Sequence, residues 1–319
     1  MRINKTLAAA LAMTSALALS ACSGGDPAPG TVDDTAAGAD GPVIGFSIST
    51  LQNPFFVSME EGVTEAAEAA GIEVTVADAS DDASQQANDI LNFISQGVDV
   101  AILNPTDGDA IISSVEALNE AGIPVITVDR RANGGEVLGH LGTDNVIAGE
   151  IAAETLFEAM GGEGKVAILE GVPGASPTID RGQGFENVLA DYPDIEVVGS
   201  QTANFQRSEG LSVAQNMLQA NPDITGFLAM NDEMALGAIE AMRSANMLGE
   251  VKVIGIDGGA DAVAAVEAGE LVATIAQQSK LMGSMSVEDA IKVAAGETVP
   301  EDQPVDVIVI DESNVAEYL

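Results

Sequence analysis

The stretch that decides the fold is Val43-Ile44-Gly45-Phe46-Ser47-Ile48, a short run rich in β-branched and aromatic residues. Such a run predicts a buried strand. An alanine-rich helical pattern follows from Phe55 to Ala70, and Gly71 stands where a helix commonly ends in the left-handed conformation. The next apolar run, Ile72–Ala77, predicts a second strand. A strand, a helix and a strand in this order form the unit from which parallel sheets are built.

The same alternation continues along most of the chain. Further predicted strands are Val98–Leu103, Ile123–Val128, Val166–Leu169, Ile195–Gly199, Gly226–Met230, Val251–Ile256 and Val272–Ala276. Further predicted helices are Ser84–Gln96, Ala110–Ala121, Ile147–Met160, Gly184–Ala190, Ser208–Ala220, Glu233–Ala245 and Ala260–Ala268. Because the strands are continuous apolar runs separated by single helices, they predict parallel sheets covered on both faces. The strands are too many for one sheet, so the pattern predicts an α/β protein with two doubly wound parallel-sheet lobes.

The composition excludes several classes of function. The chain has 50 Asp and Glu residues against 11 Lys and Arg, which gives a formal net charge of −39. Binding to nucleic acid relies on clustered basic residues, so no nucleic-acid partner is expected. There is one histidine, His140, and one cysteine, Cys22. A disulfide framework and a Cys/His zinc site are therefore excluded, and we expect neither a metal nor a cofactor.

The first 21 residues have the pattern of a secretory signal. Arg2 and Lys5 form a basic head, and the apolar run Leu7–Leu19 is too short for a permanent membrane span, which needs roughly 20 residues. The sequence Leu19-Ser20-Ala21-Cys22 resembles the end of a bacterial lipoprotein signal, where the cysteine becomes the lipidated N-terminus. We predict lipidation at Cys22. The alternative, a buried cysteine, fits less well because a polar stretch follows it.

Residues 22–40 are rich in Gly, Pro, Ala and Asp, and Val32 is their one large apolar residue. Such a stretch cannot bury enough apolar surface to offset the entropy of ordering. We predict a disordered tether that holds a globular body off a membrane.

Polar and aromatic residues follow nearly every predicted strand. They are Ser49-Thr50-Leu51-Gln52-Asn53-Pro54-Phe55-Phe56, Asn104-Pro105-Thr106-Asp107, Asp129-Arg130, Asp180-Arg181-Gly182, Asn204-Phe205, Asn231-Asp232-Glu233, Asp257-Gly258 and Gln277. In doubly wound sheets ligands bind at the carboxyl ends of the strands, so these residues predict one ligand site shared by the two lobes. Carboxylates accept protons from sugar hydroxyls, guanidinium and amide groups donate to them, and aromatic rings pack on the C–H face of a sugar. Paired Asp and Arg balance their charges, which favours a neutral polyol.

Each of these residues also has a simpler interpretation. Asn53-Pro54 could merely begin a helix, and Asn231-Asp232 could merely cap one. Asp129-Arg130 could be a surface ion pair. Phe55-Phe56, however, cannot both face one core from a helix, and the coincidence of so many polar strand ends favours a binding site.

These segments, together with Thr127-Val128-Asp129-Arg130, Asn231-Asp232-Glu233-Met234-Ala235-Leu236-Gly237-Ala238 and Ala273-Thr274-Ile275-Ala276-Gln277, closely resemble the ribose-binding proteins of bacterial ABC importers. The resemblance runs from about Gly41 to the C-terminus and departs at Ser176-Pro177-Thr178-Ile179-Asp180. It implies two lobes, joined by a three-strand hinge, that close on a sugar. Lobe 1 would comprise residues 41–143 and 278–306, and lobe 2 residues 144–277 and 307–319.

The resemblance also implies a site. Residues that stack on the sugar fall on Phe55, Phe56 and Phe205. Residues that bind its hydroxyls fall on Ser49, Asn53, Asn104, Asp129, Arg130, Arg181, Asn231, Asp257 and Gln277.

The function implied is that of a monomeric, extracytoplasmic sugar-binding lipoprotein, not an enzyme. It would deliver a small monosaccharide, with D-ribose as the first candidate, to the membrane permease of an ABC importer. Cys22 would anchor it to the cell membrane. Two alternatives stay open: a binder of another small sugar or sugar-like signal, and a carboxylate-dependent glycoside hydrolase. A sugar-responsive repressor is disfavoured, because a signal and a tether replace its basic DNA-binding head.

Three further patterns are interpreted as structural. Gly161-Gly162-Glu163-Gly164-Lys165 lacks the full phosphate-loop spacing and predicts a helix-to-strand turn. His140 has no chemical partner in the sequence and is expected to be structural. Glu60-Glu61 and Asp81-Asp82 are expected to be solvated surface.

Overall fold

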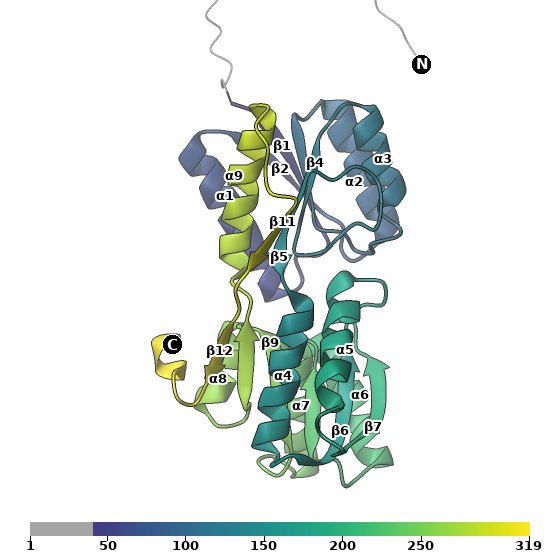
Figure 1. The fold of residues 1–319 in the computed structure, drawn as a ribbon, viewed down its shortest axis with the longest axis vertical. Coiled ribbons are helices and arrows are strands. Elements are labelled where there is room, and N and C mark those ends of the chain that lie inside the picture. The colour runs from purple at the N-terminus through teal and green to yellow at the C-terminus, as the bar shows by residue number, and fades with distance from the viewer. Residues whose placement is uncertain (1–40) are drawn as a thin grey trace, which may run out of the picture. The chain divides into compact units, whose positions relative to one another are not determined.

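The computed structural model describes residues 41–319 (Figure 1). The predicted signal, Cys22 and the tether lie outside the described residues. The first lobe contains β1 (Val43–Ile48), α1 (Pro54–Ala70), β2 (Glu73–Asp78), α2 (Ala83–Gln96), β3 (Val100–Leu103), α3 (Ile112–Glu120), β4 (Val125–Val128), β5 (Gly139–Thr143), α9 (Ser279–Ala294) and β11 (Asp302–Val305). The second contains α4 (Asn145–Ala159), β6 (Glu163–Glu170), α5 (Ser176–Leu189), β7 (Asp194–Thr202), α6 (Arg207–Ala220), β8 (Gly226–Ala229), α7 (Asp232–Ala245), β9 (Lys252–Asp257), α8 (Ala260–Glu267), β10 (Ala273–Ala276), β12 (Ile308–Asp311) and the short 3₁₀ helix Val315–Glu317.

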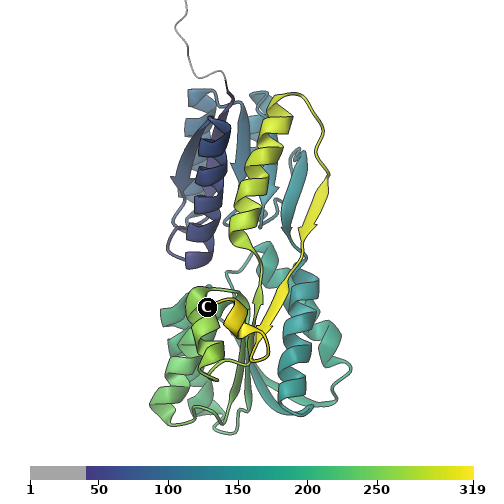
Figure 2. The ribbon, with the colours of Figure 1, turned by 90° about the vertical axis from the view of Figure 1, so that its left-hand side faces the viewer.

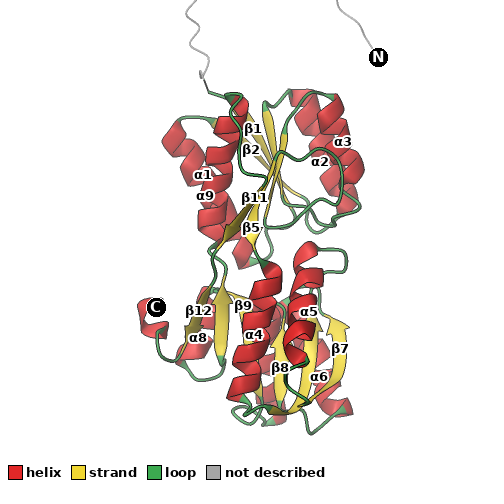
Figure 3. Cartoon of the chain, viewed as in Figure 1, coloured by secondary structure: helices red, strands yellow, loops and turns green. Residues whose placement is uncertain are grey.

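Each lobe is built on one sheet (Figures 1 and 3). The order in the first is β11-β5-β4-β3-β1-β2, with every pair parallel. The order in the second is β12-β10-β9-β8-β6-β7, parallel except for the antiparallel pair of β10 and β12. The predicted fold class, two doubly wound α/β lobes, is confirmed.

The sheet of the first lobe is buried on both faces. Successive residues of β3 point to opposite sides, so Ile102 joins the apolar cluster under α1 and α9, whereas Leu103 joins the cluster under α2 and α3. Helices α1 and α9 lie side by side (Figure 2). Glycines allow this close packing, because a Cβ at Gly62 or at Gly283 would lie 2.1 Å from a backbone oxygen of the other helix.

The chain passes between the two lobes three times. The passages are from β5 to α4, from β10 to α9, and from β11 to β12 (Figure 2). All three lie at strand ends, beside the carboxyl edges of the sheets where ligands of such folds bind.

Several predicted boundaries are accurate and some are wrong. Helices α1 and α2 end at Gly71 and Gly97 with φ of 69° and 70°, as expected. Helix α5 begins at Ser176, not at Gly184, because proline is well suited to the first turn of a helix and Pro177 supplies it. The turn from α4 into β6 is confirmed at the glycine-rich segment 161–164.

The prediction from the alternating pattern omitted β5, α9, β11 and β12. Strand β5 reads Gly139-His140-Leu141-Gly142-Thr143, so it lacks a continuous apolar run. Its glycines are needed because backbone approaches closely: a Cβ at Gly139 would lie 2.8 Å from the oxygen of Pro300. Within residues 41–319, no helix combines the length and the apolarity that a bilayer span requires.

Candidate ligand-binding site

A small chamber of about 20 Å³ lies where the carboxyl ends of both sheets meet. Its wall is formed by Asn53, Phe55, Phe56, Asp129, Arg130, Pro177, Arg181, Phe205, Asn231, Asp257 and Gln277. Ten of the twelve predicted ligand residues are thus brought together from both lobes. Ser49 and Asn104 do not line the chamber, and Pro177 was not among the predicted residues.

Helix α1 places three of the chamber residues. The Asn53 side chain accepts a hydrogen bond from the Phe55 amide over 2.9 Å and caps the helix, and Pro54 begins it. The simpler interpretation of this pair is therefore correct, and Asn53 reaches the chamber as well. Phe55 and Phe56 are both buried, with ring centroids 5.1 Å apart at an interplanar angle of 82°. The two adjacent rings are accommodated because both also border the chamber.

Asp129 and Arg130 follow β4 and are almost completely buried, at 3% and 2% exposure. The interpretation as a surface pair is therefore wrong. Arg130 Nε lies 3.9 Å from Asp129 Oδ2, and the guanidinium lies 5.0 Å from the ring centroid of Phe56 and 5.8 Å from that of Phe205. Asp129 has φ of 62°, a left-handed conformation that is unfavourable for most residues and concentrates at functional sites.

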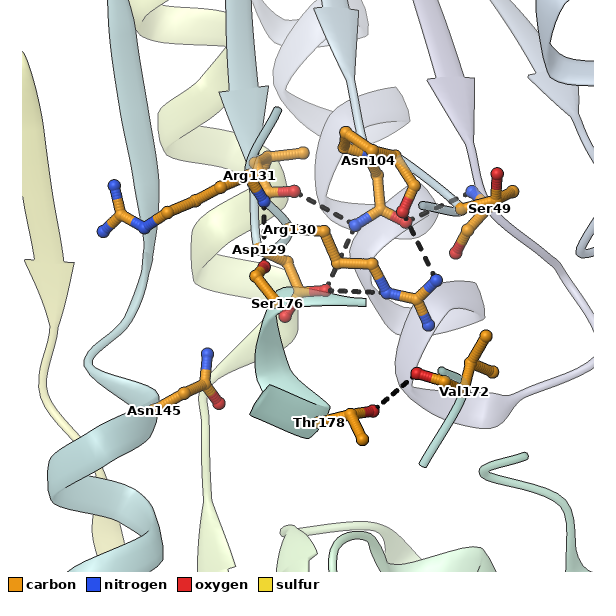
Figure 4. A network of polar contacts seen from close by, with 12 residues as sticks. Ser49, Asn104, Asp129, Arg130, Arg131, Asn145, Val172, Ser176 and Thr178 are labelled. Atoms are coloured by element: carbon orange, nitrogen blue, oxygen red, sulfur yellow. Dashed lines mark hydrogen bonds and ion pairs between the residues drawn. The ribbon is translucent and has the colours of Figure 1, made fainter. Parts of the chain in front are cut away.

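Asn104 lies behind Asp129 and orients it (Figure 4). Its Oδ1 accepts from the Ser49 amide over 3.1 Å, and its Nδ2 donates to the Val128 oxygen over 3.0 Å and to Asp129 Oδ2 over 3.1 Å. The side chain is completely buried and uses both of its polar atoms within the protein. Ser49 is equally buried. The structure thus gives Asn104 a supporting position for the chamber.

Arg181 enters the chamber from α5. Its Nε donates to Asn145 Oδ1 over 2.8 Å, and its Nη1 donates to the Met230 oxygen. The guanidinium lies 5.9 Å from the Phe205 ring centroid, so this ring contacts both arginines of the chamber. Cation–π contacts of this kind are strengthened by desolvation, and both arginines are buried.

The remaining wall comes from three strand ends of the second sheet. Asn231 caps α7 by accepting from the Met234 amide over 3.0 Å, as the simpler interpretation expected, and it also donates to the Phe205 oxygen over 3.2 Å. Asp257 Oδ1 accepts from Gln277 Nε2 over 2.7 Å. Gln277 is 1% exposed, and its Oε1 has no hydrogen-bond partner within residues 41–319. This buried acceptor is available to a donor in the chamber.

Asp232 does not line the chamber but fixes the loop after Asp257. Its carboxylate accepts from the amides of Gly258 and Gly259, each over 2.9 Å, and from Thr274 Oγ1 over 2.8 Å. Burial raises the pKa of Asp232 to about 6. Its role is therefore to position the loop.

The charges of the chamber are balanced. Burial raises the pKa of Asp129, and the positive charges of Arg130 and Arg181 oppose that rise. Burial also raises the pKa of Asp257 well above its usual range, and the neighbouring Asp232 adds to the effect. Burial lowers the pKa of both arginines. Two carboxyl groups facing two guanidinium groups suit a neutral ligand that both donates and accepts hydrogen bonds.

A wider outer cleft of about 410 Å³ adjoins the chamber and shares Asn53, Phe56, Arg130 and Phe205 with it. Asp81 is exposed, as expected, and it also lines this open cleft. Burial raises its pKa, opposed by Arg130. Because Asp81 closely follows the end of β2, the rule of strand ends could have identified it. The described part of the chain holds no cluster of three or more metal-ligating side chains.

Comparison with known proteins decides the family. Residues 44–298 match the family described as periplasmic binding protein domain. The chain belongs to the periplasmic binding protein family. Within it, the ribose import binding protein RbsB of Bacillus subtilis (strain 168) is 46% identical over 256 residues, which cover 80% of this chain and 83% of that protein. The resemblance to ribose-binding proteins is therefore confirmed.

Solved structures of ABC transporter solute-binding proteins have the same fold. One, an ABC transporter periplasmic solute-binding protein from Actinobacillus succinogenes 130z with bound D-allose, is 36% identical, covers 87% of this chain and 100% of its own, and has a TM-score of 0.82. Another, from Bacillus halodurans C-125 with bound myo-inositol, is 35% identical, covers 88% and 98%, and has a TM-score of 0.84. All three compared proteins are binding proteins of import systems or transporters. Membership of this family therefore indicates extracytoplasmic sugar binding for transport.

Proposed function

We propose that this chain is the D-ribose-binding component of an ABC importer. The observation that carries the proposal is the chamber itself, in which Asp129, Arg130, Arg181 and Asp257 surround a small space between three phenylalanine rings. A pentose offers hydroxyl groups to these carboxylates and guanidinium groups and a C–H face to the rings. The 46% identity to a ribose import binding protein favours ribose over the D-allose and myo-inositol bound by more distant relatives.

The sugar would bind by closure of two lobes, residues 41–143 with 278–306 and residues 144–277 with 307–319. The chamber has room for about one water molecule, so a pentose enters only when its walls separate. Walls from both lobes then contact one ligand, which stabilises the closed arrangement by mass action. The closed, loaded, monomeric protein would deliver its sugar to the membrane permease.

Binding without turnover separates this proposal from the glycoside hydrolase alternative. The carboxyl groups of the chamber are held by partners: Asp129 by Asn104 and Asp257 by Gln277. Such anchoring suits fixed hydrogen-bond acceptors, and no observation favours the hydrolase.

Closure is tested by small-angle scattering of the purified protein with and without D-ribose, while NMR follows the sugar. We expect a smaller radius of gyration with ribose and unchanged sugar after prolonged incubation. An unchanged radius, or conversion of ribose or of a methyl riboside, contradicts the proposal.

We also propose that Cys22 carries a lipid anchor after removal of residues 1–21. Membrane fractionation and mass spectrometry of the mature N-terminus test this. Wild-type protein should fractionate with membranes and begin at a lipidated Cys22, whereas Cys22→Ala should be released or remain unprocessed. A wild-type protein found free with another N-terminus contradicts the anchor.

A further inference from the structure

A set of contacts outside the chamber joins the two lobes directly. The Gly108 amide of the first lobe donates to the Gly174 oxygen of the second over 3.2 Å. The Arg131 amide of the first lobe donates to Ser176 Oγ of the second over 3.0 Å (Figure 4). We call Asp107, Gly108, Arg131, Gly174 and Ser176 the interlobe latch.

The lobe-2 side of the interlobe latch is held in shape by its own lobe. Thr178 Oγ1 donates to the Val172 oxygen over 2.8 Å (Figure 4), and the Ala175 amide donates to the same oxygen over 3.3 Å. These bonds fold the loop before α5 back onto the helix. They do not depend on the other lobe, so Gly174 and Ser176 keep their relative positions when the lobes separate.

The lobe-1 side is equally fixed. Asp107 Oδ1 accepts from the amides of Asp109 and Ala110, each over 2.8 Å. The Asn133 amide donates to the Gly108 oxygen over 2.8 Å and ties this loop to the segment after Arg131. The carboxylate of Asp107 therefore cannot turn aside easily when the second lobe approaches it.

Glycine is required at position 174 for two reasons. Its φ is 84°, which is strained for residues with a side chain. A Cβ there would also lie 2.1 Å from Asp107 Oδ2, an atom of the opposite lobe. The first effect acts whether the lobes are together or apart, but the clash acts only when they are together.

The interlobe latch is continuous with the residues that face the chamber. Arg131 directly follows Asp129 and Arg130, and Ser176 directly precedes Pro177, one turn before Arg181. We propose that the interlobe latch stabilises the closed arrangement and sets the lifetime of the bound sugar, so that Gly174 and Ser176 are affinity-determining residues without ligand contact. The proposal rests on the proposed function, because the latch bonds form only in the closed arrangement, which the bound sugar favours. Ser176 lies in the segment where the resemblance to ribose-binding proteins departs.

The test uses hydrogen–deuterium exchange, because the two donors of the latch are backbone amides. Exchange at Gly108 and Arg131 is measured by mass spectrometry in the full chain, with and without D-ribose, and ribose release is measured by stopped flow. The main variant is Ser176→Ala, which removes the acceptor while leaving a residue that suits the start of α5. Gly174→Ala introduces the clash with Asp107. Ser176→Thr keeps a hydroxyl acceptor at this position. Ser244→Ala is the matched control, because within residues 41–319 the one hydrogen bond of Ser244 Oγ is to the Glu240 oxygen of its own helix, α7.

With saturating ribose we expect Ser176→Ala to speed exchange at Arg131. This variant should also release ribose roughly fivefold faster, the effect of one neutral hydrogen bond. Gly174→Ala should speed exchange at Gly108 and release ribose about tenfold faster, while Ser176→Thr and Ser244→Ala resemble wild type. Exchange at both amides that is the same in wild type, Ser176→Ala and Gly174→Ala overturns the latch. Faster exchange with unchanged release overturns its role in sugar lifetime. If wild type binds no ribose, the proposed function fails, and the role of the latch in sugar lifetime fails with it. If wild type binds ribose but exchange at both amides is unchanged in the variants, the latch alone fails.

Discussion

Arg181 and Asn145 are joined by a hydrogen bond of 2.8 Å from Nε to Oδ1. Asn145 is the first residue of α4, and its Nδ2 donates to the oxygen of Thr143, the last residue of β5, over 3.2 Å. The passage from β5 to α4 is one of the three between the lobes. An arginine of the chamber is thus fixed directly to a hinge segment, and its orientation depends on the geometry of that segment.

We expect Asn145→Ala to weaken ribose binding about tenfold, because it leaves the buried Nε of Arg181 without its acceptor. Asn145→Asp keeps an acceptor at the same position and should bind more tightly than Asn145→Ala. Calorimetry gives both affinities, and thermal unfolding verifies that the variants are folded. Equal loss in the two variants shows that Asn145 does not act through Arg181.

Removing Arg181 should have a larger effect. Arg181→Ala leaves the carboxyl groups of Asp129 and Asp257 with one positive neighbour fewer, at a cost of about 2–5 kcal/mol in binding. We expect no measurable ribose binding by this variant, while its circular dichroism stays that of a folded protein. Arg181→Lys retains the charge but loses the planar fork, and an intermediate affinity is expected. Normal binding by Arg181→Ala contradicts the assigned site.

Phe205 should govern both affinity and selectivity. Its ring lies 5.8 Å from the guanidinium of Arg130 and 5.9 Å from that of Arg181, and it also covers Gly171, where a Cβ would lie 2.0 Å from Cζ. Phe205→Ala should weaken ribose binding at least about tenfold and reduce the preference for ribose over glucose, since the chamber widens. Phe205→Leu fills part of the space without an aromatic face. If Phe205→Leu binds ribose as tightly as wild type, the packing volume at this position, and not an aromatic face, determines the affinity.

His140 makes the stability of the fold depend on pH in a specific interval. Burial lowers the pKa of this imidazole to about 3, and its Nδ1 lies 2.9 Å from Thr127 Oγ1. In the unfolded chain the imidazole titrates near 6.5, so the unfolded state gains a proton first and stability falls as pH decreases from 6.5. Between pH 6.5 and 5 the loss is about 2 kcal/mol.

Urea unfolding at several pH values measures this dependence. His140→Gln has no imidazole to protonate, so it should not lose this stability as the pH falls. Between pH 6.5 and 5 the unfolding free energy of wild type should therefore fall by about 2 kcal/mol more than that of the variant. Because His140 is the chain's one histidine, its NMR titration is directly assignable. An imidazole that titrates near 6.5 in the folded protein contradicts the assigned burial.

The strand ends made most of the chamber predictable. In parallel sheets the residue after each strand points to a common edge, so Asp129, Asn231, Asp257 and Gln277 could be assigned before their contacts were known. The sequence could not distinguish a polar residue that lines the chamber from one that hydrogen-bonds to a lining residue and holds it in place. Asn104 satisfies the same rule as Asp129, yet its two polar atoms are used by Ser49, Val128 and Asp129.

The omissions have a tertiary origin. Strand β5 has two glycines because neighbouring backbone lies against it, and a local pattern does not reveal that neighbour. Asp81 is exposed, as expected, but the sequence did not show that it lines the outer cleft, whereas its neighbour Asp82 caps α2. The interlobe latch joins Gly108 to Gly174 and Arg131 to Ser176, pairs that become adjacent only after both lobes have folded.

Calorimetric titration of the purified protein with D-ribose, D-allose, myo-inositol, D-glucose and D-galactose tests the central claim most directly. We predict that D-ribose binds to one site per chain, more tightly than each of the others, and that Arg181→Ala abolishes the signal. Absence of ribose binding, or glucose or galactose binding as tightly as ribose, contradicts the assignment of this chamber to a pentose.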